Sequence, residues 1–471
     1  MTRSSIVPVA LVAVLALAWL ANQRRKSTTA AHRKFEEWIQ EYGPLVSLRR
    51  GRELIVIIGR YNAAVEIMEK EGAALADRPP SIAAGETLSG GMRTLLIGNW
   101  RASPQTSQVR SSIQLTDLSA EIDPGPCTRS CGPWSPRSTS RFSRGMRNLT
   151  FWNILRAPED HLAHAQRYAA SVILSLTYDT HSNERLVHDI SGSQARLGAA
   201  LIPGAYLVDA YTFLRYVPGY LSNLRAQHQM ELTLFKSQLD AVRRRLDANE
   251  EHQSEYGLSD NEAAYLNGSI ASAISIVIMA AAVFPEMQNR VQEQLDRIIG
   301  AGKLPTFQDE PDLVQVTAFY LESFRWRPVS AGGFAHRATK DIVWNGYLIP
   351  KGASVYGNYW SIARDPEVFP DPERFDPQRW LTPDGKTIRE DLKIFQFGFG
   401  RRVCPGSHLA NKSLYINTAL LLWAFRISQD SKNPIDTMAF TNTANVHPLP
   451  FSVHFEPRRN IEEMSQLLRE T

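Results

Sequence analysis

Cys404 is the residue of this chain whose surroundings are best suited to chemistry. It stands in the run Phe397-Gly398-Phe399-Gly400-Arg401-Arg402-Val403-Cys404-Pro405-Gly406. A cysteine is a good metal ligand only as the thiolate, and a free thiol has a pKa of roughly 8.5. Gly400 and Gly406 allow turns that point N–H groups at the sulfur, and Arg402 adds positive charge. The apolar stretch from Leu409 to Ile427 predicts a helix whose positive end lies beside Cys404. The run therefore predicts a thiolate held against a metal.

The spacing F-x-x-G-x-R-x-C-x-G resembles the haem-binding loop of the cytochrome P450 family, and every specified position matches. The resemblance implies that Cys404 is the axial ligand of the haem iron, with Phe397 and Gly398 in the haem-binding loop. It also implies that Arg402 contacts one haem propionate and His336 another. The alternatives are a buried structural cysteine and a surface histidine.

Further motifs stand upstream in the family's order. Glu322-Ser323-Phe324-Arg325 resembles the E-x-x-R helix, in which the acid and the arginine share one helical face. Phe369-Pro370-Asp371-Pro372-Glu373-Arg374-Phe375 resembles the P-E-R-F segment. By this resemblance Arg374 completes a buried cluster with Glu322 and Arg325. The chain is most similar to the fungal microsomal branch of secondary-metabolite oxidases.

These motifs predict one large, mainly α domain of the cytochrome P450 fold with a minor β lobe, covering residues 35–471. The hydrophobic content of 43% is ample for a core, and a net charge of +4 does not suggest nucleic acid. Three cysteines exclude a disulfide scaffold and fit a reducing compartment.

The elements that must position the site follow from periodicity and turn residues. Helices are predicted at 35–42, 63–72, 167–178, 230–246 and 285–299. Strands are predicted at 45–48, 54–58, 336–343 and 353–356, and Asn345-Gly346 predicts a turn before an edge strand. A short strand pair is predicted at 441–455.

Residues 1–23 predict an N-terminal membrane anchor. Ser4 to Gln23 carries no charge and is about long enough to span a bilayer. The basic linker 24–34 follows it, so the positive-inside rule places the domain in the cytosol. We therefore expect a single-pass protein of the endoplasmic reticulum membrane. The alternative is a cleaved signal peptide with Ala16-Leu17-Ala18 as the small-residue site.

The helix expected over the haem departs from the family pattern. Related enzymes carry an acid and a threonine there, which deliver protons to oxygen. In this chain Ile270 is followed directly by Ala271, so the segment that carries this pair in the family is missing. No acidic residue occurs from Asn267 to Pro285. Ser269, Ser272 and Ser275 are candidate hydroxyl donors, although serines on an apolar helix face are more often packing residues. No catalytic residue is assigned.

A second departure begins after Trp100, which the resemblance places at a haem propionate. Pro104 stands where the W-x-x-x-R pattern needs arginine and disrupts a helix interior. Residues 101–150 contain ten serines, seven arginines and no lysine, which is typical of a disordered or loop segment. Cys127 and Cys131 lie there without further metal ligands nearby. A misplaced exon boundary or a frame slip explains both departures, and a diverged, decaying protein is the alternative.

The predicted function is that of a haem-thiolate monooxygenase acting on a hydrophobic small molecule, with electrons from NADPH through a separate reductase. Because the proton-delivery pair is missing, impaired activity is expected. The alternatives are a haem-thiolate isomerase, dehydratase or peroxide-using enzyme, and a catalytically dead haem-binding remnant. Segments 329–333 and 443–446 match places where the family lines its substrate pocket.

Overall fold

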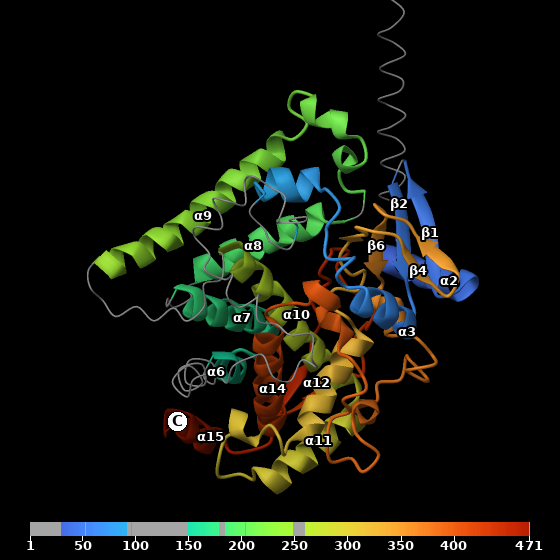
Figure 1. Cartoon of the computed structure of the whole chain (residues 1–471). Coiled ribbons are helices and arrows are strands. Elements are labelled where there is room, and N and C mark those ends of the chain that lie inside the picture. Colours follow the sequence, from blue (N-terminus) through green and yellow to red (C-terminus); the bar gives the residue numbers. More distant parts are fainter. Residues whose placement is uncertain are drawn as a thin grey trace, which may run out of the picture.

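The computed structural model describes residues 30–51, 53–91, 96, 149–178, 184–202, 204–247 and 260–470. These residues form a helical body with a sheet lobe at one side (Figure 1). The longer helices are α2 (Ala31–Tyr42), α6 (Leu149–Arg156), α7 (His161–Tyr178), α8 (Glu184–Ala200), α9 (Ser222–Asp247), α10 (Asp260–Val283), α11 (Pro285–Ile298), α12 (Val314–Trp326), α14 (Ser407–Ala424) and α15 (Ile461–Glu470). Single-turn helices are α3 (Tyr61–Ala64) and α13 (Tyr359–Ile362). The predicted class, mainly α with a minor β lobe, is confirmed.

The sheet lobe joins two distant parts of the chain. β1 (Leu45–Arg50) and β2 (Glu53–Ile58) form an antiparallel hairpin, β6 (Ser354–Gly357) runs parallel to β2, and β3 (His336–Arg337) closes the order β1-β2-β6-β3. In this register Ile55 lies opposite Ser354, and His336 lies opposite Val355. The lobe thereby brings His336 close to the N-terminal third of the chain.

The predicted strand 336–343 is interrupted, and its second half forms a separate hairpin. β4 (Ile342–Trp344) pairs with β5 (Tyr347–Ile349) around Asn345 and Gly346, whose φ angles are +45° and +81°. An asparagine–glycine pair with two positive φ angles is the favoured two-residue turn of a hairpin. The turn expected from Asn345-Gly346 is therefore confirmed. β7 (Phe425–Ser428) and β8 (His454–Pro457) form a further pair.

α10 is the central helix of the body. Every residue from Ile270 to Ala282 is buried, which is expected of a helix that is apolar on all sides. It packs against α7, α8, α12 and α14 (Figure 1). α10 continues as a helix through the position where the family's acid–threonine piece is missing.

Several predictions from the sequence lie outside the described residues: the anchor 1–23, most of the basic linker, Trp100, Cys127, Cys131 and nearly all of 101–150. Within the described ranges, no single helix is both long and apolar enough to cross a bilayer. The pair α10 and α11 meets that criterion together, with a bend of 103° between them, and α10 lies in the protein core.

Candidate functional site

Cys404 lies in a tight loop between Phe397 and the start of α14. Gly398 (φ +90°) and Gly400 (φ +59°) adopt left-handed conformations, which glycine reaches without a steric penalty. The Cys404 N–H donates to the Phe397 carbonyl with an N···O distance of 2.8 Å. α14 begins three residues later at Ser407. The predicted placement of Cys404 at the N-terminal end of an apolar helix is confirmed.

Burial and the loop backbone act on the Cys404 thiol in opposite directions. Burial raises the pKa of the Cys404 thiol above its usual value, and the Gly406 backbone N–H opposes this rise. The Arg402 guanidinium instead donates from Nε to the Ala76 carbonyl at 2.6 Å. Desolvation disfavours the anion more than one amide favours it. A metal cation at the sulfur would supply the missing compensation.

Three basic side chains from separate parts of the chain gather near one another: Arg78, His336 and Arg402. His336 is buried, with its Nδ1 atom 2.7 Å from the Leu75 carbonyl. Arg78 donates from Nη1 to the Ala335 carbonyl at 2.6 Å. Burial, together with the charges of Arg78 and Arg402, lowers the pKa of His336 to about 3. His336 is therefore an interior histidine, and the surface alternative is wrong.

Tyr359 connects this basic cluster to the cysteine loop. Its buried ring lies 6.2 Å from the ring of Phe399, measured between centroids. Burial raises the pKa of Tyr359 to about 12, with smaller opposing effects from Arg78, which lowers it, and Cys404, which raises it. One thiol and three basic groups thus share a neighbourhood. This donor set fits an iron porphyrin that carries carboxylates, because thiolate is a haem-iron ligand and basic groups pair with carboxylates.

Arg78 was not among the residues predicted from the sequence. It is 7% exposed and directly precedes Pro79 and Pro80. No spacing motif marks it. Its role in the cluster follows from the bond to Ala335, the residue before His336, which only the fold reveals.

Glu322 and Arg325 of α12 form an ion pair with no exposed side-chain surface. The guanidinium donates from Nε and Nη2 to the two carboxylate oxygens at 2.8 Å each. Its Nη1 atom donates to the carbonyls of Ala363 and Pro372, also at 2.8 Å. Such complete pairing is what allows charges to remain in a protein interior.

The prediction that the Arg374 side chain completes this cluster was wrong. Arg374 is exposed and contributes its backbone carbonyl, which accepts from Arg325 Nη2 at 3.2 Å. Arg379 takes the predicted place, with Nε 3.4 Å from the Glu322 carboxylate. Trp380 adds an indole N–H to the same carboxylate at 3.0 Å.

The error has a local cause in the sequence. The chain carries two similar segments five residues apart, Pro372-Glu373-Arg374-Phe375 and Pro377-Gln378-Arg379-Trp380. The first matches the family letters and packs Phe375 against Phe319 and Trp326 of α12. The second places Arg379 beside Glu322, with the Gln378 amide donating to the Gln315 side chain at 2.8 Å. Both segments pack against α12, and the fold turns the Arg379 side chain towards Glu322 and the Arg374 side chain outwards.

The three α10 serines differ in their surroundings. Ser275 donates to the Ala271 carbonyl of its own helix at 2.9 Å, as a packing serine does. Ser269 accepts from the Asn445 side chain at 3.0 Å. Ser272 contacts both the Gly268 carbonyl and the Nδ1 atom of His447. Burial lowers the pKa of His447, so its imidazole is favoured in the neutral form.

The structure brings together the two segments predicted to line a substrate pocket. The Val446 N–H donates to the Val329 carbonyl at 2.8 Å, and the Ser330 hydroxyl donates to the Asn445 side chain at 2.9 Å. Asn445 in turn reaches Ser269 of α10. Residues far apart in sequence therefore meet beside the central helix.

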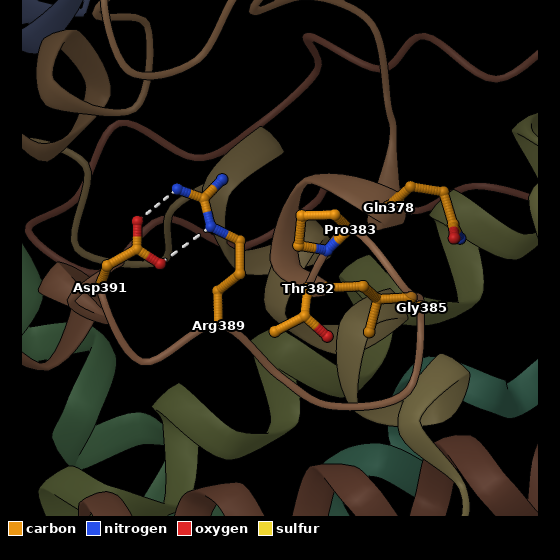
Figure 2. A pocket seen from close by; sticks show the side chains of 7 residues that line it. Gln378, Thr382, Pro383, Gly385, Arg389 and Asp391 are labelled. Atoms are coloured by element: carbon orange, nitrogen blue, oxygen red, sulfur yellow. Dashed lines mark hydrogen bonds and ion pairs between the residues drawn. The ribbon is translucent and has the colours of Figure 1, made fainter.

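A surface pocket lies apart from these residues (Figure 2). Its lining comes from residues 378–391: Gln378, Leu381, Thr382, Pro383, Gly385, Arg389 and Asp391. Arg389 and Asp391 pair with each other at one side of it, as Figure 2 shows. The lining contains neither Cys404 nor a member of the basic cluster, so this pocket is not the candidate site.

Comparisons with known proteins agree with this geometry. The family model named Cytochrome P450 matches residues 208–455. Cytochrome P450 monooxygenase 64 of Postia placenta is 49% identical over 459 residues, covering 93% of this chain and 89% of that protein. Cytochrome P450 monooxygenase 113 of the same fungus is 46% identical and covers 90% and 87%. Cytochrome P450 monooxygenase fogE of Aspergillus ruber is 31% identical and covers 88% and 79%.

The family model spans more than half of the chain and includes Cys404, and the similarity to full-length relatives extends over nearly all of it. The matched region contains the cysteine loop, the Glu322 cluster and His336. This chain belongs to the cytochrome P450 family of haem-thiolate oxidoreductases.

Proposed function

We propose that the protein is a haem-thiolate monooxygenase that inserts one atom of O₂ into a hydrophobic small molecule. The observation that carries the proposal is the meeting of one thiol, Cys404, with the basic groups of Arg78, His336 and Arg402. Cys404 binds the iron, and the basic groups hold the haem carboxylates. The haem supplies the oxygen activation, and the protein provides its ligand, its orientation and an apolar surrounding.

The proposal also covers the role of the protein in the cell. We assign it a part in fungal secondary metabolism, with electrons from NADPH through a separate reductase. Its similarity to fungal cytochrome P450 monooxygenases supports the oxidation itself. We place the protein on the endoplasmic reticulum membrane with its domain in the cytosol. Exposed aromatic side chains between α8 and α9, those of Tyr211, Phe213 and Tyr216, support contact with a membrane interface.

Impaired turnover is part of the proposal. No acidic residue occurs from Asn267 to Pro285, and Ser275 is engaged by its own helix. Positioned proton transfer contributes about 10²–10⁴-fold in rate, so its loss is a large deficit. The same observation favours a second candidate, an isomerase or peroxide-using haem-thiolate enzyme, which does not depend on proton delivery to O₂.

The test is a reduced carbon monoxide difference spectrum of the purified chain loaded with haem. We expect a thiolate-type band that Cys404→Ala abolishes and that Cys127→Ala leaves unchanged. Loss of the band in the Cys127 variant but not in the Cys404 variant would overturn the assignment.

Turnover separates the two enzyme functions. Product formed with NADPH and a reductase supports the monooxygenase, and a large share of the consumed NADPH is expected to appear as hydrogen peroxide. Conversion of an organic peroxide without NADPH, with no product in the reductase assay, supports the second candidate. A chain that retains no haem would support the remnant.

A further inference from the structure

The segment Val65–Lys70 and the residues after it touch the cysteine loop directly. A Cβ atom added to Gly72 would lie 2.8 Å from the Gly400 Cα, and one added to Gly400 would lie 2.7 Å from the Met68 carbonyl oxygen. Real Cβ contacts are essentially never this short. Two backbones therefore meet here with no room for side chains, four residues before Cys404.

Glu69 joins the two backbones at this contact. One of its carboxylate oxygens accepts the Gly400 N–H at 2.6 Å, and the other pairs with the Lys393 ammonium group. Lys393 is itself fixed, because its backbone N–H donates to the Tyr61 hydroxyl at 2.6 Å. Its ammonium group lies 5.9 Å from the centre of the Phe399 ring. Both side chains of the ion pair are about one-third exposed.

The contact has consequences for the conformation of the loop. Gly400 has a left-handed φ of +59° and starts a short turn, so its N–H has no place in a regular helix or strand. A carboxylate is a stronger acceptor for such a donor than a neutral oxygen. The pairing with Lys393 offsets the negative charge that Glu69 would otherwise place beside the Cys404 loop.

We propose that Glu69 is a positioning residue for the Cys404 loop, holding the Gly400 N–H through its carboxylate, and that Lys393 balances its charge. This inference rests on the proposed haem-thiolate function. It assigns no contact between Glu69 and the haem: Glu69 acts through the backbone that carries Cys404.

The first measurement needs no haem. Hydrogen exchange of peptides covering residues 398–403 is followed in the full chain for wild type, Glu69→Ala and Glu69→Gln. We expect faster exchange in Glu69→Ala and an intermediate rate in Glu69→Gln, because the amide oxygen still accepts a hydrogen bond. Equal exchange in all three proteins would overturn the proposal.

Glu53→Gln is the matched control. Glu53 also pairs with a cation, Arg50, and also bridges to another segment through Ser354, with similar exposure, but in the sheet lobe. We expect exchange of residues 398–403 to stay at the wild-type rate in this variant. Acceleration equal to that of Glu69→Ala would reveal a general loss of stability and count against a specific role for Glu69.

The second measurement is the reduction potential of the haem-loaded protein. Removing the acid in Glu69→Gln should raise the potential, and removing the cation in Lys393→Met should lower it. General loosening of the loop would shift both in the same direction, which would contradict the charge balance. If the wild type takes up no haem, the proposed function fails, while the exchange experiment still decides whether Glu69 holds the loop.

Discussion

Two buried charged clusters in the described part of the chain, around Glu322 and around His336, differ in what completes them. In the first, the Glu322 carboxylate receives Arg325, Arg379 and the Trp380 indole N–H. In the second, Arg78 and Arg402 lie beside a neutral His336, and their hydrogen bonds described above go to backbone carbonyls. The first cluster contains its own counter-charge at hydrogen-bond distance, whereas the second is predominantly basic, with the charge of Asp77 acting on Arg402.

This difference indicates that one cluster stabilises the fold and the other binds a ligand. Removing one partner of a buried ion pair is strongly destabilising, because the remaining charge stays buried without compensation. A basic cluster beside a free thiol gains from an anionic ligand, because opposite charge stabilises the cations. The Glu322 cluster therefore holds the fold, and the Arg78 cluster is suited to bind haem carboxylates.

Breaking the Glu322 cluster should have the largest effect on stability. Glu322→Gln leaves Arg325 without a charged partner in the interior, and we expect a loss of about 3–5 kcal/mol in the free energy of unfolding. Urea denaturation of the haem-free chain measures it, with soluble yield as a second readout. The control is Glu37→Gln, whose side chain is 57% exposed in its pair with the half-exposed Lys34, and where we expect less than about 1 kcal/mol. Equal losses would contradict the contrast.

Removing a cation from the basic cluster should weaken haem binding more than folding. A hydrogen bond to a charged group contributes about 1.5–3 kcal/mol, so Arg78→Gln should weaken haem affinity by roughly 10–100-fold. Haem titration followed by absorbance measures this change. Arg374→Gln, at an exposed arginine, should bind haem like the wild type. Unchanged affinity in Arg78→Gln would remove Arg78 from the site.

The assignment of Arg379 in place of Arg374 can be tested by a matched pair of variants. Arg379→Met should cost about 1–3 kcal/mol in unfolding free energy, because the buried Glu322 loses a charged partner. Arg374→Met should stay within about 0.5 kcal/mol, as surface substitutions usually do. Urea denaturation at neutral pH compares them. The reverse order would restore the interpretation made from the sequence.

The pH dependence of stability should report on the basic cluster. The pKa of His336 is lowered from 6.5 to about 3 in the folded protein, so its neutral form is favoured there. Its contribution is complete above pH 6.5 and is lost as the pH falls towards 3, with a slope of about 1.4 kcal/mol per pH unit for one proton. His336→Gln should reduce the slope between pH 6 and 5 by up to that amount. The exposed His188, changed to Gln, serves as the control. An unchanged slope in His336→Gln would contradict the low pKa.

The local parts of the site could be predicted from the sequence because they rest on short-range geometry. The glycine-rich run before Cys404, the helix after it and the Asn345-Gly346 turn each follow from the conformations open to a few adjacent residues. The i, i+3 spacing of Glu322 and Arg325 likewise places both on one helix face. The apolar stretches predicted the main helices, although their ends differ: the helix expected at Leu409–Ile427 is Ser407–Ala424, and the chain then enters β7.

Only the tertiary structure decided which distant groups meet. Arg379 and not Arg374 pairs with Glu322, because both similar segments pack against α12 but only the Arg379 side chain faces the carboxylate. Arg78 joins His336 through the neighbouring Ala335 carbonyl, and Glu69 reaches Gly400 across 331 positions of sequence. The pKa of Cys404 depends on how deeply the thiol is buried, and the spacing of residues in the sequence does not reveal that burial. Long-range contacts and desolvation arise from how the elements pack together, so they became visible only in the folded chain.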